Sequence, residues 1–260
     1  MSEPLASSAR GRAAFTALAR AERPLLFLDL DGTLAPFADR PMDARVPPRT
    51  RRILQQLRRG GALVVLVSGR SVPQVRQVAR TPVDAILGDH GARCATHHRV
   101  RPLLPADVPA FEKAVARVRA RLAGHAGLRL EIKDRSLAVH FRHLGHAHEH
   151  HEARAVAALL RQAGLRALLG HHVVDGQLPG VDKGHGVLRW LGREECRHCD
   201  AVLYAGDDTT DEDALRALRG RGVTIAVGPR VRHAALRTRD PRTLAAWLAR
   251  LAARRARRRG

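Results

Sequence analysis

The chain has 260 residues, a formal net charge of +21 and only 3% aromatic residues. This length is enough for one or two domains with a substantial core. No apolar stretch reaches the roughly 18 to 20 residues that cross a membrane, and residues 1–23 alternate Ala with Arg instead of forming a signal-peptide core. We therefore expect a cytoplasmic protein with no membrane partner. We interpret residues 1–23 as an N-terminal extension.

Almost all of the positive charge comes from arginines spread along the chain, because Lys113, Lys133 and Lys183 are the only lysines. A nucleic-acid-binding protein is expected to gather its cations on one face and to interleave aromatic side chains for stacking. Neither pattern is present, so we expect no nucleic-acid partner. The same charge suits a small anionic substrate such as a sugar phosphate.

Buried strands alternate with helices in the first third of the chain. We predict strands over 25–30, 63–67 and 85–88 and helices over 48–59 and 72–79. Each strand is an apolar run that ends in polar residues or Gly. This order is typical of the start of a parallel, doubly wound sheet.

From about residue 96 the pattern changes. We predict helices over 105–123 and 148–163 and strands over 128–132, 137–142 and 166–174. The first two of these strands alternate apolar with polar residues, as strands with one exposed face do. We interpret residues 96–179 as a small α+β domain inserted into the first one.

The strand and helix alternation returns after residue 180. We predict helices over 186–191, 211–219 and 241–252 and strands over 201–205 and 223–227. The predicted fold is therefore α/β: a doubly wound, Rossmann-like core over 24–95 and 180–260 that carries the inserted domain.

Polar side chains with complementary chemistry lie at the ends of these elements. Asp29 and Asp31 follow the first strand and Ser68 follows the second, while Lys183 opens a helix. An acidic cluster follows the strand over 201–205, with carboxylates at Asp207, Asp208 and Asp211. The carboxyl ends of parallel strands lie at one edge of a sheet, so we expect these groups to gather there. Together they suit phosphoryl transfer, in which a carboxylate attacks phosphorus while Mg²⁺, a hydroxyl and an ammonium neutralise the phosphoryl oxygens.

Five motifs carry a resemblance to a known family over residues 24–250. They are LDLDGTLAP at 28–36, SGR at 68–70, GDHG at 88–91, PGVDKG at 179–184 and GDDTTDED at 206–213. The chain resembles the phosphatases of the haloacid-dehalogenase (HAD) superfamily and, within them, the trehalose-6-phosphate phosphatases. The resemblance implies a Mg²⁺-dependent enzyme that hydrolyses trehalose 6-phosphate, a step of trehalose biosynthesis, through an aspartyl-phosphate.

The resemblance also implies roles for the core residues. Asp29 would be the nucleophile, and Asp31 would protonate the departing sugar and then activate water. Ser68 and Lys183 would hold the phosphoryl oxygens, with Thr33 beside them. The metal ligands would be Asp29, the main-chain carbonyl of Asp31 and Asp207, with Asp208 and Asp211 behind them or in place of a water.

The inserted domain resembles the cap that closes over the active site in this family. Sugar contacts would come from Glu131 and Lys133, and from Asp175, which stands where the family has Glu. Arg142 is a further candidate contact. Arg70 and His90 lie in loops of the core beside the site; Arg70 either binds substrate or orders its loop, and His90 fixes its loop beside the hinge of the cap.

Several alternatives stay open. A related HAD sugar phosphatase, acting on sucrose phosphate or mannosylglycerate phosphate, would share the core motifs and differ in the cap, while a nucleic-acid-binding protein would come from another class. We expect a monomer. Cys94, Cys196 and Cys199 are interpreted as incidental thiols. We interpret the histidines of the segment 140–151 as part of a solvated linker; they are His140, His143, His146, His148, His150 and His151.

Overall fold

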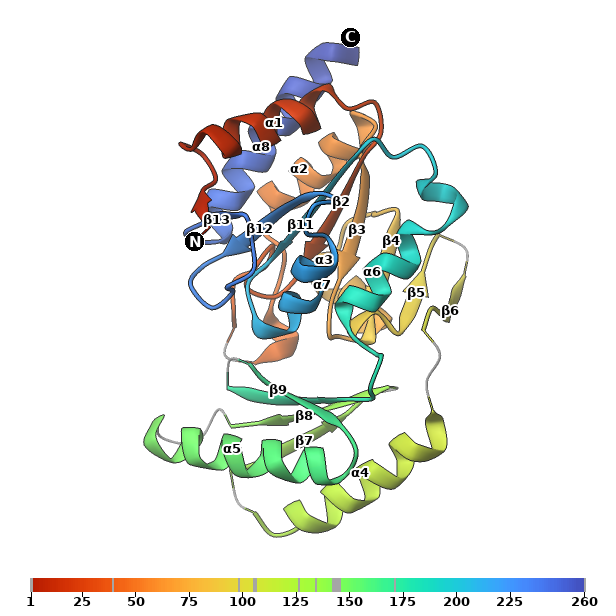
Figure 1. The fold of residues 1–260 in the computed structure, drawn as a ribbon, viewed down its shortest axis with the longest axis vertical. Helices are drawn as coiled ribbons and strands as arrows, with labels where there is room; N and C mark the ends of the chain where they lie inside the picture. The colour runs from red at the N-terminus through yellow and green to blue at the C-terminus, as the bar shows by residue number, and fades with distance from the viewer. Residues whose placement is uncertain are drawn as a thin grey trace.

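The computed structural model describes residues 2–38, 40–97, 99–104, 107–125, 127–133, 135–141, 146–170 and 172–259. A nine-stranded sheet with helices on both faces forms the larger part, and a four-stranded sheet lies below it in the view of Figure 1. The α/β fold with an added α+β module agrees with the sequence prediction. None of the described helices is both long and apolar enough to span a lipid bilayer.

The large sheet is parallel over most of its width. Its order is β1 (Glu3–Pro4), β13 (Leu236–Thr238), β12 (Val223–Val227), β11 (Ala201–Gly206), β2 (Pro24–Asp29), β3 (Leu63–Val67), β4 (Ala85–Gly88), β5 (Arg93–Ala95) and β6 (Val100–Pro102). All neighbours from β1 to β4 are parallel, whereas β5 and β6 are antiparallel additions at one edge.

The chain reverses its direction of travel across the sheet between β2 and β11. It moves from β2 through β3 to β4 on one side, and later from β11 through β12 to β13 on the other. In open α/β sheets the crevice beyond the carboxyl ends of the strands at such a reversal is where ligands bind. Asp29 ends β2, and Asp207 directly follows β11, so both lie at this place.

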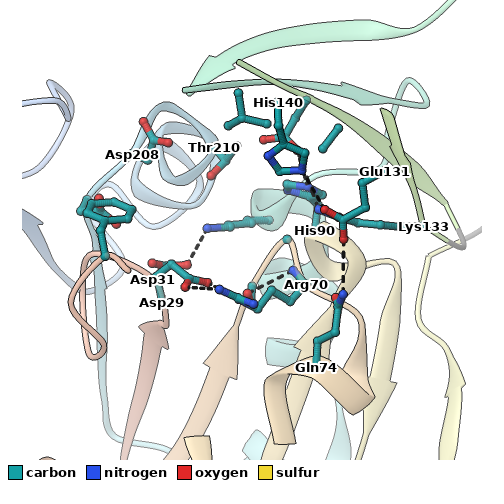
Figure 2. A pocket seen from close by; sticks show the side chains of 18 of the residues that line it. Asp29, Asp31, Arg70, Gln74, His90, Glu131, Lys133, His140, Asp208 and Thr210 are labelled. Carbon is teal, nitrogen blue, oxygen red and sulfur yellow. Dashed lines mark hydrogen bonds and ion pairs between the residues drawn. The ribbon is translucent and has the colours of Figure 1, made fainter. Parts of the chain in front are cut away.

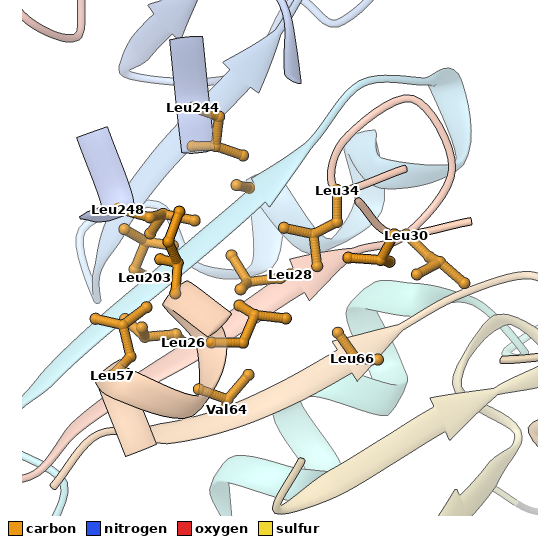
Figure 3. Packing of buried hydrophobic residues seen from close by; sticks show 14 of the residues in the cluster. Leu26, Leu28, Leu30, Leu34, Leu57, Val64, Leu66, Leu203, Leu244 and Leu248 are labelled. Carbon is orange, nitrogen blue, oxygen red and sulfur yellow. The ribbon is translucent and has the colours of Figure 1, made fainter. Parts of the chain in front are cut away.

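Both faces of the sheet are buried, which is why its strands are almost continuously apolar. One face packs against α1 (Ala9–Arg20), α2 (Pro48–Arg59), α3 (Val72–Ala79) and α8 (Pro241–Arg259). The other face packs against α6 (Lys183–Leu191) and α7 (Glu212–Ala217). Figure 3 shows the first core, in which leucines of α2 and α8 meet those of β2 and β11.

Residues of the N-terminal extension are packed onto the core, which the sequence did not indicate. The segment supplies β1, which pairs with β13, and α1, which packs beside α8. Arg255 of α8 is 3% exposed and donates to the carbonyls of Leu18, Ala21 and Glu22. It also donates to Gly60, which follows α2. One buried guanidinium thus links the C-terminal ends of α1 and α2, where backbone carbonyls lack a partner within the helix.

The smaller sheet has the order β7 (Arg129–Ile132), β8 (Ser136–His140), β10 (Val173–Gln177) and β9 (Arg166–Gly170), all antiparallel. Helices α4 (Val108–Leu122) and α5 (His146–Gln162) cover its outer face. The single strand predicted over 166–174 was wrong: β9 and β10 form a hairpin, with His172 in the left-handed region at φ +54°.

Helix boundaries near the site also differ from the prediction. Helix α6 begins at Lys183, three residues before the predicted start, because the Asp182 side chain accepts from the backbone N–H of His185 and caps it. The predicted helix over 211–219 is a 3₁₀ turn, Thr209–Asp211, followed by α7.

Candidate active site

An ammonium between two carboxylates forms the centre of the site. Lys183 Nζ donates to Asp29 Oδ1 and to Asp211 Oδ1, each at 2.7 Å. All three side chains are at most 5% exposed. Burial opposes the charge on Lys183, but Asp211 and Asp29 raise its pKa well above the usual value. Lys183 therefore stays a cation and holds Asp29 at the end of β2.

Asp211 is the organising carboxylate of this centre. Besides Lys183 it accepts from the hydroxyl of Tyr204 at 2.6 Å and from the backbone N–H groups of Asp207 and Asp208 at 3.1 and 3.0 Å. Burial, together with the neighbouring carboxylates, raises the pKa of Tyr204 well above its usual value, so its hydroxyl remains a donor. Both oxygens of Asp211 accept hydrogen bonds, so Asp211 positions Lys183 and the acidic loop, residues 207–211.

Two glycines permit this close packing. Gly32 has φ +76°, and a Cβ there would lie 2.2 Å from Asp207 Oδ2. A Cβ on Gly206 would lie 2.3 Å from Asp211 Cγ. No larger residue fits at either position without moving a carboxylate, which explains the Gly in each motif.

The residues at this edge suit a divalent cation. Carboxylate oxygens of Asp29, Asp207 and Asp211 lie within 4.8 Å of one another. Asp207 Oδ2 is buried and accepts no hydrogen bond from a described residue, although Arg230 lies 3.7 Å away. Burial and then the neighbouring carboxylates raise the pKa of Asp29 to about 7 and that of Asp207 to about 10. A hard cation such as Mg²⁺, which prefers oxygen ligands, would relieve this repulsion.

Asp208 and Thr33 take different places around the acidic loop. Asp208 lines the cavity, caps the 3₁₀ turn through Thr209 N–H at 2.8 Å, and has its pKa raised by burial. Thr33 is fully buried and donates to Asp207 Oδ1 at 3.3 Å. Thr33 is not among the residues that line the cavity, and its hydroxyl is instead directed at Asp207.

Ser68 and Arg70 complete the core side of the cavity. The Ser68 hydroxyl oxygen accepts from Arg70 N–H at 3.1 Å, which leaves its own O–H free to point at a ligand. The Arg70 guanidinium makes a two-point ion pair with Asp31: Nε to Oδ2 and Nη2 to Oδ1, both 2.6 Å. The structure pairs Arg70 with Asp31, and the two roles predicted for Arg70, binding substrate or ordering its loop, stay predictions.

A cavity of about 550 Å³ extends from these carboxylates to the small sheet, and both modules line it. The sheet contributes one face: Glu131, Ala138 and Asp175 form a row across β7, β8 and β10, and Arg129, His140 and Val173 form the next row. The small side chain of Ala138 leaves space between Glu131 and Asp175. The cavity is within the usual size range for small-molecule sites.

The predicted sugar contacts lie in this wall. Glu131 Oε2 is 2.8 Å from His140 Nε2, and Glu131 Oε1 accepts from Gln74 of α3 at 3.3 Å. The hydrogen bond from His140 is the largest cause that lowers the Glu131 pKa to about 2. Lys133 Nζ lies 3.9 Å from Asp175. Asp175 lines the cavity although its side chain is shorter than the Glu of the family.

His90 reaches the cavity from a strained loop. Asp89 and His90 both have positive φ, +50° and +54°, which is uncommon for two successive residues other than Gly. His90 is 2% exposed, lies against Gly69, and has Nε2 at 3.6 Å from Asp175 Oδ1. Burial lowers its pKa despite Asp175, so the neutral imidazole is favoured.

The structure brings together most of the residues singled out from the sequence. Arg142 and His143 lie outside the described residues. His140 is not part of a solvated linker, because it lies on β8 with its side chain 16% exposed and bonded to Glu131. The linker interpretation is also wrong for His148, His150 and His151, which are exposed but lie in α5. Sequence reasoning missed His140, Gln74 and Tyr204. The thiols of Cys94, Cys196 and Cys199 are free and lie away from the cavity lining.

Residues 27–240 match the family model described as trehalose-phosphatase. The chain belongs to the trehalose-phosphatase family. It is 33% identical over 243 residues to trehalose-phosphate phosphatase of Mycobacterium marinum, an alignment that covers 88% of this chain and 62% of the relative. The chain therefore spans less than two thirds of the length of that relative.

Solved structures show the same fold. The C-terminal domain of Candida albicans trehalose-6-phosphate phosphatase superposes with a TM-score of 0.84 at 20% identity, covering 97% of this chain and 98% of that one. A HAD-superfamily phosphatase from Bacteroides thetaiotaomicron gives 0.59 at 16% identity, covering 87% and 93%. Both structures therefore share the fold of this chain over most of its length.

Proposed function

We propose that this chain is a Mg²⁺-dependent phosphatase that hydrolyses trehalose 6-phosphate to trehalose and phosphate. The observation that carries the proposal is the buried Lys183–Asp29 pair beside Asp207, at the floor of a cavity whose roof is lined by Glu131, Lys133 and Asp175. The floor suits a phosphoryl group and the polar roof suits sugar hydroxyls. Family membership supports the same reaction.

In the first step Asp29 attacks phosphorus. Lys183 holds Asp29 Oδ1, so we assign the attack to Oδ2. A bond forms between Oδ2 and phosphorus while the bond from phosphorus to the sugar oxygen breaks. Asp31, protonated for this step, gives its proton to the leaving oxygen. Ser68 and Lys183 donate to the phosphoryl oxygens, which lets one anion approach another.

In the second step water attacks the aspartyl-phosphate. Asp31, now a carboxylate, takes a proton from the water as the water oxygen bonds to phosphorus. The bond between phosphorus and Asp29 Oδ2 breaks, which restores Asp29 and releases phosphate. One carboxyl group therefore serves as acid and then as base, as its place two residues after the nucleophile allows.

Mg²⁺ is the cation that we propose for the acidic edge. Asp29, the main-chain carbonyl of Asp31 and Asp207 would hold it, with Asp208 nearby. When bound, Mg²⁺ neutralises charge on the phosphoryl group. Asp211 already accepts four hydrogen bonds, so we assign it to holding Lys183 and the loop instead of to the metal.

We also propose that residues 96–179 act as a cap on a core formed by 24–95 and 180–260. The cap would exclude water and present Glu131, Lys133 and Asp175 to the sugar. Arg70 would orient Asp31 while it is ionised, as it is before the second step, and His90 would contact the substrate beside Asp175.

A side-by-side assay of phosphate release tests this function. Purified protein with excess Mg²⁺ is given trehalose 6-phosphate, sucrose 6-phosphate or glucose 6-phosphate, and kcat/KM is measured for each. We expect trehalose 6-phosphate to be the best substrate. A preference for sucrose 6-phosphate would favour the related sugar phosphatase, and a preference for glucose 6-phosphate would contradict the assignment of the cap to a disaccharide.

A further inference from the structure

We propose that His140 and Gln74 are positioning residues that fix the Glu131 carboxylate for recognition of the leaving-group sugar, and that Gln74 makes this recognition depend on contact between the two modules. The inference rests on the proposed function and extends it to residues outside the family motifs quoted above. Figure 2 shows His140 and Gln74 on opposite sides of Glu131.

His140 holds Glu131 from within the small sheet. Arg129 pairs with His140 and Glu131 pairs with Ala138, so Glu131 and His140 are diagonal neighbours on the same face of β7 and β8. The Glu131 carboxylate can only accept in its ionised form, so the imidazole Nε2 must carry the proton of the 2.8 Å hydrogen bond. One carboxylate oxygen is thereby fixed in direction.

Gln74 holds the other oxygen from the core. It lies in the first turn of α3, where its Oε1 accepts from Ser71 N–H at 3.0 Å and closes a capping box. The cap bond fixes the amide so that its Nε2 points at Glu131 Oε1, 3.3 Å away. This donor belongs to the large sheet's helix layer, and its partner belongs to the small sheet.

The two bonds together hold both oxygens of a carboxylate in the cavity wall. A carboxylate oxygen has more than one acceptor site, so each can still accept a sugar hydroxyl. The bond to Gln74 exists only while β7 lies over α3. Glu131 is therefore fully oriented in the arrangement in which the cavity is roofed, and a sugar that uses Glu131 favours that arrangement.

Matched substitutions separate orientation from packing. His140→Leu removes the donor, whereas His140→Gln places an amide nitrogen at about the position of Nε2 and keeps it. Gln74→Glu keeps the acceptor for Ser71 N–H but replaces the donor to Glu131 by a charged oxygen. His148→Leu, on the exposed side of α5, is the control for loss of a histidine from the same module.

The readout compares trehalose 6-phosphate with p-nitrophenyl phosphate, whose leaving group has no sugar hydroxyls. We expect His140→Leu and Gln74→Glu to lower kcat/KM for trehalose 6-phosphate by about tenfold or more, mainly through KM, and to change turnover of p-nitrophenyl phosphate by less than about twofold. His140→Gln should retain most of the activity on the sugar phosphate, and His148→Leu all of it.

Two results would overturn the inference: an equal loss on both substrates in His140→Leu, which would make its role structural, or no loss on trehalose 6-phosphate in either donor-removing variant. The wild-type protein is assayed first. Absence of wild-type turnover of trehalose 6-phosphate overturns the proposed function, whereas an active wild type with unaffected variants overturns only the roles of His140 and Gln74.

Discussion

Arg70 and Asp31 form a two-point ion pair in which both contacts are 2.6 Å. The guanidinium occupies both oxygens of the carboxylate that we assign as acid and base. Its Nη1 also donates to the thioether sulfur of Met42, Sδ, at 3.8 Å. Bidentate pairs of this kind fix direction as well as distance. Arg70 therefore sets where Asp31 stands before a proton is transferred, and Asp31 must leave the pair to give one.

Removing this guanidinium should impair turnover without unfolding the protein. We expect Arg70→Ala to lower kcat by about ten- to a hundredfold, because Asp31 loses the group that orients it. Arg70→Lys should recover only part of the loss, since an ammonium cannot make the two-point contact. Arg76→Ala, an exposed arginine on α3, is the control. Equal kinetics of Arg70→Ala and wild type would show that Asp31 needs no such partner.

The stability of the folded protein should depend on pH, and the stabilisation by Mg²⁺ should depend on pH as well. The pKa of Asp29 is raised from 3.8 to about 7, and that of Asp207 to about 10, by burial and neighbouring carboxylates. The folded state then binds these protons more tightly than the unfolded chain, so the contribution favours folding at low pH and is lost as pH rises through this range. Metal-free protein should therefore lose stability from about pH 4 upward, where the two groups ionise in the unfolded chain, until they ionise in the folded protein near pH 7 and pH 10.

Added Mg²⁺ binds the ionised carboxylates, so it should raise Tm more at about pH 8 than at about pH 5. Thermal unfolding with EDTA and with excess Mg²⁺ across this range measures the effect. An Mg²⁺-induced rise in Tm that is the same at all pH values, or is absent in the wild type, would argue against a metal at this edge.

Arg255 should contribute strongly to stability although it lies far from the cavity. Arg255→Met would remove the donors to carbonyls of Leu18, Ala21 and Gly60 and leave those oxygens buried. We expect the free energy of unfolding to fall by about 3 kcal/mol, measured by urea denaturation. Arg254→Met, at the exposed neighbouring position, should change it by less than about 0.5 kcal/mol. Similar values for the two variants would contradict the role of Arg255.

The fold was predictable where the hydrophobic periodicity agrees with the residues that end helices and strands. Strands β3 and β4 and helices α2 and α3 have the predicted bounds, because each is an apolar or amphipathic run with a clear stop. The hairpin of β9 and β10 was missed because its turn uses His172 at positive φ, where sequence rules expect Gly or Asn. The packing of residues 1–23 was missed because it depends on the distant Arg255.

The candidate site was predictable in its core and less so in its roof. Asp29, Lys183 and Asp207 follow from strand ends that a parallel sheet gathers at one edge. The sequence analysis did not distinguish His140 from the neighbouring histidines. The feature that would have indicated its role is the strand register, which places His140 diagonal to Glu131. Gln74 had no signal of that kind, since its bond to Glu131 joins residues 57 positions apart in different modules.

Phosphate release from trehalose 6-phosphate by wild-type protein and by Asp29→Asn, both with excess Mg²⁺, tests the central claim most directly. Asn keeps the size of the side chain but is a poor nucleophile, and its amide oxygen can still accept from Lys183. We predict sustained turnover by the wild type and background release by Asp29→Asn, with both proteins folded at the assay temperature. Comparable release by Asp29→Asn would show that Asp29 is not the nucleophile.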